Sequence, residues 1–261
     1  MSFRGPSGLV FVVLAGVALG ALAASQPEWN FDSIGYAGAA GRWLGSSDAD
    51  LHQRVYAELE AAAPAKARRE IAAGSGYRSA LASDAHAFAS QLPFYSGKPL
   101  YVALVALAAR LGLNAVASAF YVSAVVYGLL AIAWLLALGR LASRPLAWGL
   151  GLCILLSPPL RELGRLGTPD ALAALFAFAG ACTVLFAHGR RGLGIALVLW
   201  LAAICARPDS AVFALALLAW LAWCSPQQRR AALAGALVCA LACLAVSFTG
   251  GYPWSTLITH T

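Results

Sequence analysis

Seven apolar segments set the strongest constraint on how this chain folds. They occupy residues near 8–24, 117–139, 145–160, 169–187, 192–206, 210–224 and 231–248. A helix of roughly 20 apolar residues crosses the hydrocarbon core of a bilayer. Because 61% of the 261 residues are hydrophobic and only 11% are charged, an ordinary soluble domain is excluded. The sequence therefore predicts an all-α polytopic membrane protein with about seven transmembrane helices.

An eighth apolar run, at 99–113, decides the topology of everything that follows it. Suppose that this run, which carries Arg110, does not cross the membrane and that the N-terminus is inside. The inner segments then hold no acidic residue and seven arginines: Arg4, Arg140, Arg144, Arg190, Arg191, Arg229 and Arg230. This matches the positive-inside rule, and a crossing at 99–113 would move six of these arginines outside. We therefore expect 99–113 to lie in the outer interface or to dip part-way into the membrane.

This topology gives the domain organisation that we expect. The chain 1–261 is a single transmembrane domain, with a first extracytoplasmic loop at 26–114, a six-span bundle at 115–249 and an extracytoplasmic tail at 250–261. The N-terminus is cytoplasmic. An alternative for the first span is a signal peptide, because an apolar core follows Arg4 and ends at "ALAAS". Abundant Ala, Gly and Arg with little Lys favour a bacterial source, and hence the bacterial inner membrane.

The long first loop contains short amphipathic segments. Residues 32–45, 48–63 and 65–74 have helical apolar spacing, and Asp32 and Asp48 are expected to cap the first two helices. Trp29 and Trp43 suit a membrane–water interface. Helices parallel to the membrane would form a roof over a cavity.

The cysteines do not indicate disulfides or a zinc site, and the net charge does not indicate binding to nucleic acid. The six cysteines lie in or at the ends of apolar runs without a CxxC pair, so neither a disulfide framework nor a zinc–thiolate site is expected. The net charge of +7 is concentrated in inner segments, as the positive-inside rule predicts, so no nucleic-acid partner is expected.

Charged residues border the spans on the predicted outer side. They are Asp32, Lys98, Arg161, Arg165, Asp170, Arg207 and Asp209. Taken singly, Asp170 and Asp209 follow prolines at helix starts and can be explained as caps, and the arginines as interfacial side chains. Taken together, ionisable groups so close to the hydrocarbon indicate function. Carboxylates beside guanidinium groups suit a ligand with an anionic phosphate head and a lipid tail.

Four short stretches carry a family resemblance. They are "EWNFDSIGYAGAA", "SGKPLYVALVALAARLGL", "LSPPLRELGRLGTPDAL" and "RPD" at 207–209. With the large loop after the first span, this layout resembles the GT-C class of membrane glycosyltransferases, which includes protein O-mannosyltransferases and the lipid A aminoarabinose transferases. Many members of the class have further spans, whereas this sequence stops after the seventh.

The resemblance implies a chemistry and a role for each candidate residue. The donor would be a polyprenyl-phosphate sugar and the acceptor would lie on the extracytoplasmic side, in the cell envelope. Asp32 would be the general base. Arg165, Arg207, Lys98 and Arg161 would bind the donor phosphate, and Tyr36, Asp170 and Asp209 would bind or orient the sugar. Some members use a metal, so Mg²⁺ or Mn²⁺ bound by Asp32 and Asp170 is an option and not a requirement.

Two other functions stay open at this stage. The short length favours a non-enzymatic subunit of a membrane glycan-assembly complex, which would need a partner membrane subunit. A lipid-linked sugar transporter or flippase would also place charge inside a helical bundle. Transporters often show internal repeats and charge near the midplane, whereas this chain shows no clear repeat and its charges gather at one face.

Overall fold

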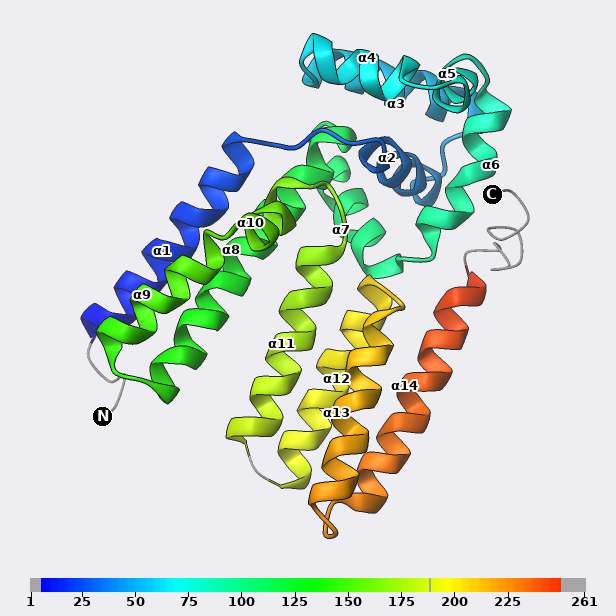
Figure 1. Cartoon of the computed structure of the whole chain (residues 1–261). Helices are drawn as coiled ribbons and strands as arrows, with labels where there is room; N and C mark the ends of the chain where they lie inside the picture. Colours follow the sequence, from blue (N-terminus) through cyan, green and yellow to red (C-terminus); the bar gives the residue numbers. More distant parts are fainter. Residues whose placement is uncertain (1–5, 188, 250–261) are drawn as a thin grey trace.

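The computed structural model describes residues 6–187 and 189–249, and within them the secondary structure is helical without a β-strand (Figure 1). The helices are α1 (Pro6–Ser25), α2 (Asp32–Trp43), α3 (Asp48–Ala62), α4 (Ala65–Ala73), α5 (Gly76–Ser83), α6 (Ala85–Ser96), α7 (Pro99–Arg110), α8 (Ala115–Leu141), α9 (Arg144–Leu155), α10 (Pro158–Arg165), α11 (Asp170–Phe186), α12 (Arg190–Ala206), α13 (Ser210–Cys224) and α14 (Arg229–Thr249). The predicted tail at 250–261 lies outside the described residues.

Long apolar helices form the body of the protein, and α3 and α4 lie across one end of it (Figure 1). In the described ranges, three helices are long and apolar enough to cross a membrane, namely α1, α8 and α14, or up to five if each of two bent pairs counts as one span. Helices α11 and α13 are apolar but shorter. A polytopic membrane protein fits these findings, and the count of seven spans stays a prediction.

The apolar run at 99–113 forms α7, which is a short helix. Its 12 residues measure about 18 Å along the axis, less than the roughly 30 Å of a hydrocarbon core. It meets α6 at a bend of 119°, so the chain nearly reverses there. The break has a local cause, because Lys98 precedes Pro99 and a residue before proline is disfavoured from helical backbone angles. Lys98 accordingly has φ −123° and ψ 62°.

The predicted span at 145–160 corresponds to α9, which ends at Leu155, and the first residues of α10. The structure divides it into α9 and α10, which meet at a bend of 66°. The reason is again a residue before proline, since Ser157 takes an extended ψ of 146° ahead of Pro158. The chain therefore turns at Ser157, and α10 is a separate short amphipathic helix.

The segment between α1 and α8 contains the predicted helices, but both of the predicted caps are wrong, and its position outside the membrane stays a prediction. The three expected amphipathic helices are present as α2, α3 and α4, and α5 and α6 follow them. Asp32 does not cap α2, because Asn30 Oδ1 accepts the hydrogen bond from the Ser33 N–H. Ser47, rather than Asp48, caps α3 by accepting from the Asp50 N–H. The Asp32 carboxylate is therefore left for another role.

Close backbone packing joins α1 to α8. A Cβ added to Gly16 would lie 2.7 Å from the Gly128 carbonyl oxygen, and a Cβ added to Gly128 would lie 2.8 Å from the Gly16 oxygen. Small residues at such crossings let transmembrane helices approach each other closely. The pair holds the end of α1, and hence the start of the loop, against the bundle.

Candidate functional site

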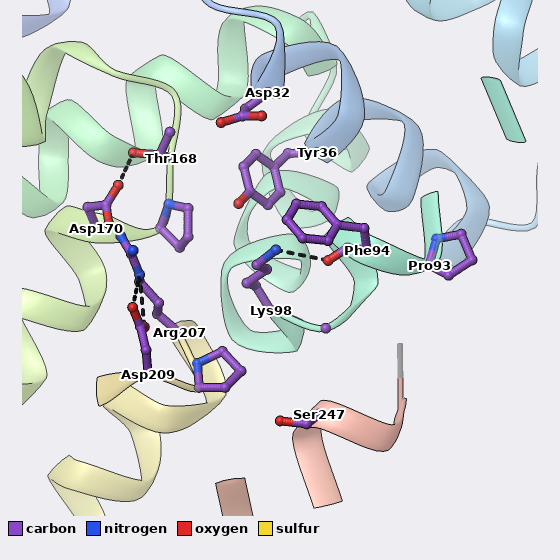
Figure 2. A pocket seen from close by; sticks show the side chains of 13 residues that line it. Asp32, Tyr36, Pro93, Phe94, Lys98, Thr168, Asp170, Arg207, Asp209 and Ser247 are labelled. Atoms are coloured by element: carbon purple, nitrogen blue, oxygen red, sulfur yellow. Dashed lines mark hydrogen bonds and ion pairs between the residues drawn. The ribbon is translucent and has the colours of Figure 1, made fainter. Parts of the chain in front are cut away.

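A pocket with a volume of about 390 Å³ lies where the loop helices meet the bundle (Figure 2). Its lining comes from α2, the α6–α7 break, the turns before α11 and α13, and α14. The lining residues are Asp32, Tyr36, Pro93, Phe94, Gly97, Lys98, Thr168, Pro169, Asp170, Arg207, Pro208, Asp209 and Ser247. Acidic, basic and aromatic side chains from distant parts of the sequence thus share one cavity.

Asp32 enters this pocket from the first turn of α2. The Tyr95 hydroxyl of α6 donates a hydrogen bond of 3.1 Å to Asp32 Oδ1. Helix α6 comes this near because Gly35 has no side chain, and a Cβ at that position would overlap the ring of Tyr95. One carboxylate oxygen is therefore held, while in the described residues no bond is made to Oδ2.

Tyr36 lies one helical turn after Asp32 and presents its hydroxyl to the cavity (Figure 2). Its ring contacts Tyr95 and Tyr101 edge-on, with ring centroids 5.0 and 4.9 Å apart. Burial raises the pKa of the Tyr36 hydroxyl, and the nearby Asp32 charge acts in the same direction. The hydroxyl therefore keeps its proton at neutral pH and is a hydrogen-bond donor for a ligand.

Lys98 is the cation on the opposite side of Tyr36 from Asp32 (Figure 2). Its ammonium donates to the Phe94 carbonyl at 2.9 Å and lies 3.6 Å from the Phe94 ring centroid. No carboxylate in the described part of the chain is within ion-pair distance of it. Burial, with help from Arg207, lowers the pKa of Lys98 to about 8, against the opposing charges of Asp32 and Asp209.

The two Pro-Asp turns meet through Arg207. Its Nε donates to both carboxylate oxygens of Asp209, at 2.8 and 2.9 Å, and its Nη1 is paired with Asp170. Neither aspartate side chain caps its own helix, so the alternative explanation as caps fails for both. The Arg207 side chain is 43% exposed and lines the pocket, and its Nη2 donates no hydrogen bond to any described residue. The guanidinium therefore has donors available for a ligand.

A buried hydrogen-bond chain fixes the turn that carries Asp170. The Tyr101 hydroxyl contacts Ser123 Oγ at 3.1 Å, and Ser123 Oγ donates to the Thr168 carbonyl at 2.9 Å. Thr168 Oγ1 then donates to Asp170 Oδ2 at 2.7 Å. Through these contacts, α7 and α8 position the carboxylate that pairs with Arg207.

Six of the eight predicted site residues line the pocket, and two do not. Arg165 pairs with Glu28 at 3.0 Å and Glu162 at 2.7 Å, and its Nε donates to the Gln26 carbonyl. It connects α10 to the segment after α1, so this side chain is already occupied outside the pocket. Arg161, on the same helix, has a buried Nε without a hydrogen-bond partner in the described ranges, and it does not line the pocket either.

Tyr95 and Thr168 are pocket partners that sequence reasoning missed. Tyr95 holds Asp32 and Thr168 holds Asp170. The sequence indicated these residues only by their closeness to predicted site residues, since Tyr95 comes three residues before Lys98 and Thr168 comes two before Asp170. Closeness in the sequence does not distinguish a residue of the site from any other residue nearby.

The optional divalent cation does not fit these residues well. No group of three or more His, Cys, Asp or Glu side chains able to hold a metal is present in the described part of the protein. Asp170, one of the two expected ligands, is engaged by Arg207 and Thr168. No step below is assigned to a metal.

Comparisons with known proteins identify no relative, so the functional argument is based on the geometry of the pocket. No protein-family model, curated protein or solved structure matches the chain.

Proposed function

We propose that this protein is a membrane glycosyltransferase that moves a sugar from a polyprenyl-phosphate donor to an extracytoplasmic acceptor. One observation carries the proposal. Three charged groups share one pocket: the Asp32 carboxylate, the Lys98 ammonium and the Arg207 guanidinium. Among the described residues, Asp32 Oδ2 accepts no hydrogen bond, Lys98 forms no ion pair and Arg207 Nη2 donates no hydrogen bond. Such a site supplies both a base and a phosphate-binding cation, which glycosyl transfer from a phosphate requires.

In the proposed reaction, an acceptor hydroxyl or amine attacks the anomeric carbon of the donor sugar. The bond from that carbon to the phosphate oxygen breaks, and its electron pair leaves with the polyprenyl phosphate. The acceptor proton passes to Asp32 Oδ2, and water later removes it. Tyr95 holds the other oxygen, so the base keeps its orientation.

Positive charge stabilises the departing phosphate. Lys98 is free to approach it, and Arg207 offers Nη2 while Asp170 and Asp209 hold the rest of the guanidinium in place. Groups fixed in advance in this way do not need to reorganise as charge develops on the leaving oxygen. The Tyr36 hydroxyl is placed to donate to a sugar oxygen.

The pocket also has a route for a lipid tail. Ser247 of α14 lines it, and the neighbouring Leu244 and Phe248 are 54% and 77% exposed. Pro93 and Phe94 add apolar lining on the α6 side. A prenyl chain resting on these surfaces would remain in the hydrocarbon while its phosphate reaches Lys98.

The test uses the full chain reconstituted in liposomes with a panel of labelled polyprenyl-phosphate sugars and extracted membrane acceptors. Release of polyprenyl phosphate is measured for the wild type, Asp32→Asn and the matched control Asp50→Asn, an exposed loop carboxylate outside the pocket. We expect Asp32→Asn to lower turnover by about 10²- to 10⁴-fold. Binding of undecaprenyl phosphate should change little, and Asp50→Asn should be normal.

Other outcomes would identify the alternatives. Unchanged turnover in Asp32→Asn would contradict the proposed base. Movement of the intact donor across the bilayer without cleavage would instead establish a transporter. Activity that appears only with a second membrane protein, and that survives Asp32→Asn, would establish a non-enzymatic subunit.

A further inference from the structure

The end of the bundle opposite the pocket is basic without any acidic residue. The turns α8–α9, α11–α12 and α13–α14 lie at this end, away from α3 and α4 (Figure 1). They carry Arg140, Arg144, Arg190, Arg191, Arg229 and Arg230. None of the 11 acidic residues of the chain falls in 115–161, 171–208 or 210–249, the segments that contain these turns. The six arginines therefore give this end a net positive charge.

One of these arginines borders a cavity. The cavity has a volume of about 210 Å³ and is lined by Arg140, Cys182, Thr183, Phe186 and Ala187. The Arg140 guanidinium carbon lies 5.1 Å from the centroid of the Phe186 ring, so the aromatic face supports the cation. Arg140 is exposed, and no ion pair to it is found among the described residues.

Apolar surface continues from this cavity along the sides of the helices. Leu141 follows Arg140 and is 63% exposed, and Leu185 precedes Phe186 and is 55% exposed. A ligand at Arg140 therefore meets positive charge at one end and exposed hydrocarbon beside it. Arg190 and Arg191 begin α12 three and four residues after Ala187 and add charge near the same turn.

We propose that the arginine-rich end binds anionic phospholipids, with the Arg140 cavity holding the headgroup phosphate of one lipid. A guanidinium binds a phosphate diester through two parallel N–H bonds. The acyl chains would pack against Leu141 and Leu185. A free phosphate ion has no acyl chains and would gain nothing from these apolar side chains. Basic pockets between helices attract anionic headgroups in this manner. The site is independent of the proposed sugar transfer, because it shares no residue with the pocket at Asp32.

The experiment measures binding of phosphatidylglycerol to the full chain in neutral detergent by native mass spectrometry, with phosphatidylcholine as the neutral lipid. The variants are Arg140→Gln, Arg140→Lys and a matched control, Arg110→Gln, which removes an exposed arginine from the last turn of α7 at the other end. We expect Arg140→Gln to weaken phosphatidylglycerol binding about fivefold. Arg140→Lys should lose less, and Arg110→Gln and the phosphatidylcholine series should not change.

Three results would overturn this proposal. Equal binding of the two lipids would show that the protein has no preference for an anionic headgroup. Equal losses of binding in Arg140→Gln and Arg110→Gln would show that the Arg140 cavity is not the binding site. Full competition by millimolar inorganic phosphate would show that the ligand is the free ion. The unfolding temperature of each variant in phosphatidylcholine is measured alongside, and a normal value for Arg140→Lys keeps the comparison decisive even if Arg140→Gln unfolds.

Discussion

Lys98 is a residue of the pocket whose charge changes between pH 7 and pH 9. Its pKa of about 8 lies below the ordinary 10.5, because the side chain is buried and Arg207 is near. The ammonium is therefore charged at pH 7 and mostly neutral at pH 9. In the proposed function, its charge would stabilise a bound phosphate below pH 8, and this stabilisation would be lost as the pH rises through 8.

This gives a prediction for donor binding. Between pH 7 and pH 9, the affinity of the wild type for undecaprenyl phosphate should fall by about tenfold relative to Lys98→Met, which binds weakly at both values. The phosphate ligand also titrates with pH, but its protonation state is the same for the wild type and Lys98→Met at each pH, so the ratio of their affinities reports on Lys98. Lys98→Arg should bind well throughout, because a guanidinium stays charged. Isothermal titration in detergent measures the dissociation constants, and parallel pH profiles for the wild type and Lys98→Met would contradict the role of Lys98.

Tyr95 acts through Asp32, so it is a positioning residue. Tyr95→Phe removes the 3.1 Å hydrogen bond and leaves the ring contacts with Tyr36 available. We expect kcat to fall roughly tenfold with little change in KM, since a bond to a charged group is lost. Steady-state kinetics measure both parameters, with Tyr121→Phe on the exposed side of α8 as the control. A rise in KM at constant kcat would place Tyr95 in substrate binding instead.

Most helices were predictable, whereas their breaks and caps were less so. Apolar runs and amphipathic spacing predict α8, α14 and the loop helices. The end of the apolar helix near Ser157 was predictable from Pro158, because proline disfavours helical backbone angles in the residue before it, whereas the separate helix α10 was not predicted. The cap at Asp32 was wrong because Asn30, two residues earlier, competes for the same backbone N–H groups.

Helix packing gives a stability prediction at this scale. Gly128→Ala should destabilise the protein by about 1–3 kcal/mol, because the added methyl group meets the Gly16 carbonyl of α1. Gly149→Ala is the matched control, since a Cβ there has no atom within 4 Å and alanine favours the helix. Thermal unfolding in detergent, followed by circular dichroism, measures both. Equal stability of the two variants would show that α1 and α8 are not in backbone contact.

At the scale of the whole molecule, the topology argument selected seven charged residues, of which five line the pocket, whereas Tyr36 was selected only by the family resemblance. The predicted placement of Asp32, Lys98 and the two Pro-Asp turns at one membrane face agrees with the pocket that they share. Arg165 was not distinguishable by this reasoning, because it lies at the same face. Its occupation by Glu28 and Glu162 depends on how α10 packs beside the end of α1, which no spacing in the sequence reports.

The predicted topology, with the Asp32 pocket outside and the arginine-rich end inside, can be tested by labelling. In a chain without its six native cysteines, Ala61→Cys on α3 and Arg191→Cys on α12 introduce exposed thiols at opposite ends of the molecule. If the arginine-rich end faces the cytoplasm, an impermeant maleimide applied to intact cells should label Ala61→Cys at once and Arg191→Cys only after permeabilisation. Gel-shift of the labelled protein measures the extent. Rapid labelling of Arg191→Cys in intact cells would put the Asp32 pocket on the cytoplasmic side, where an extracytoplasmic acceptor has no access to it.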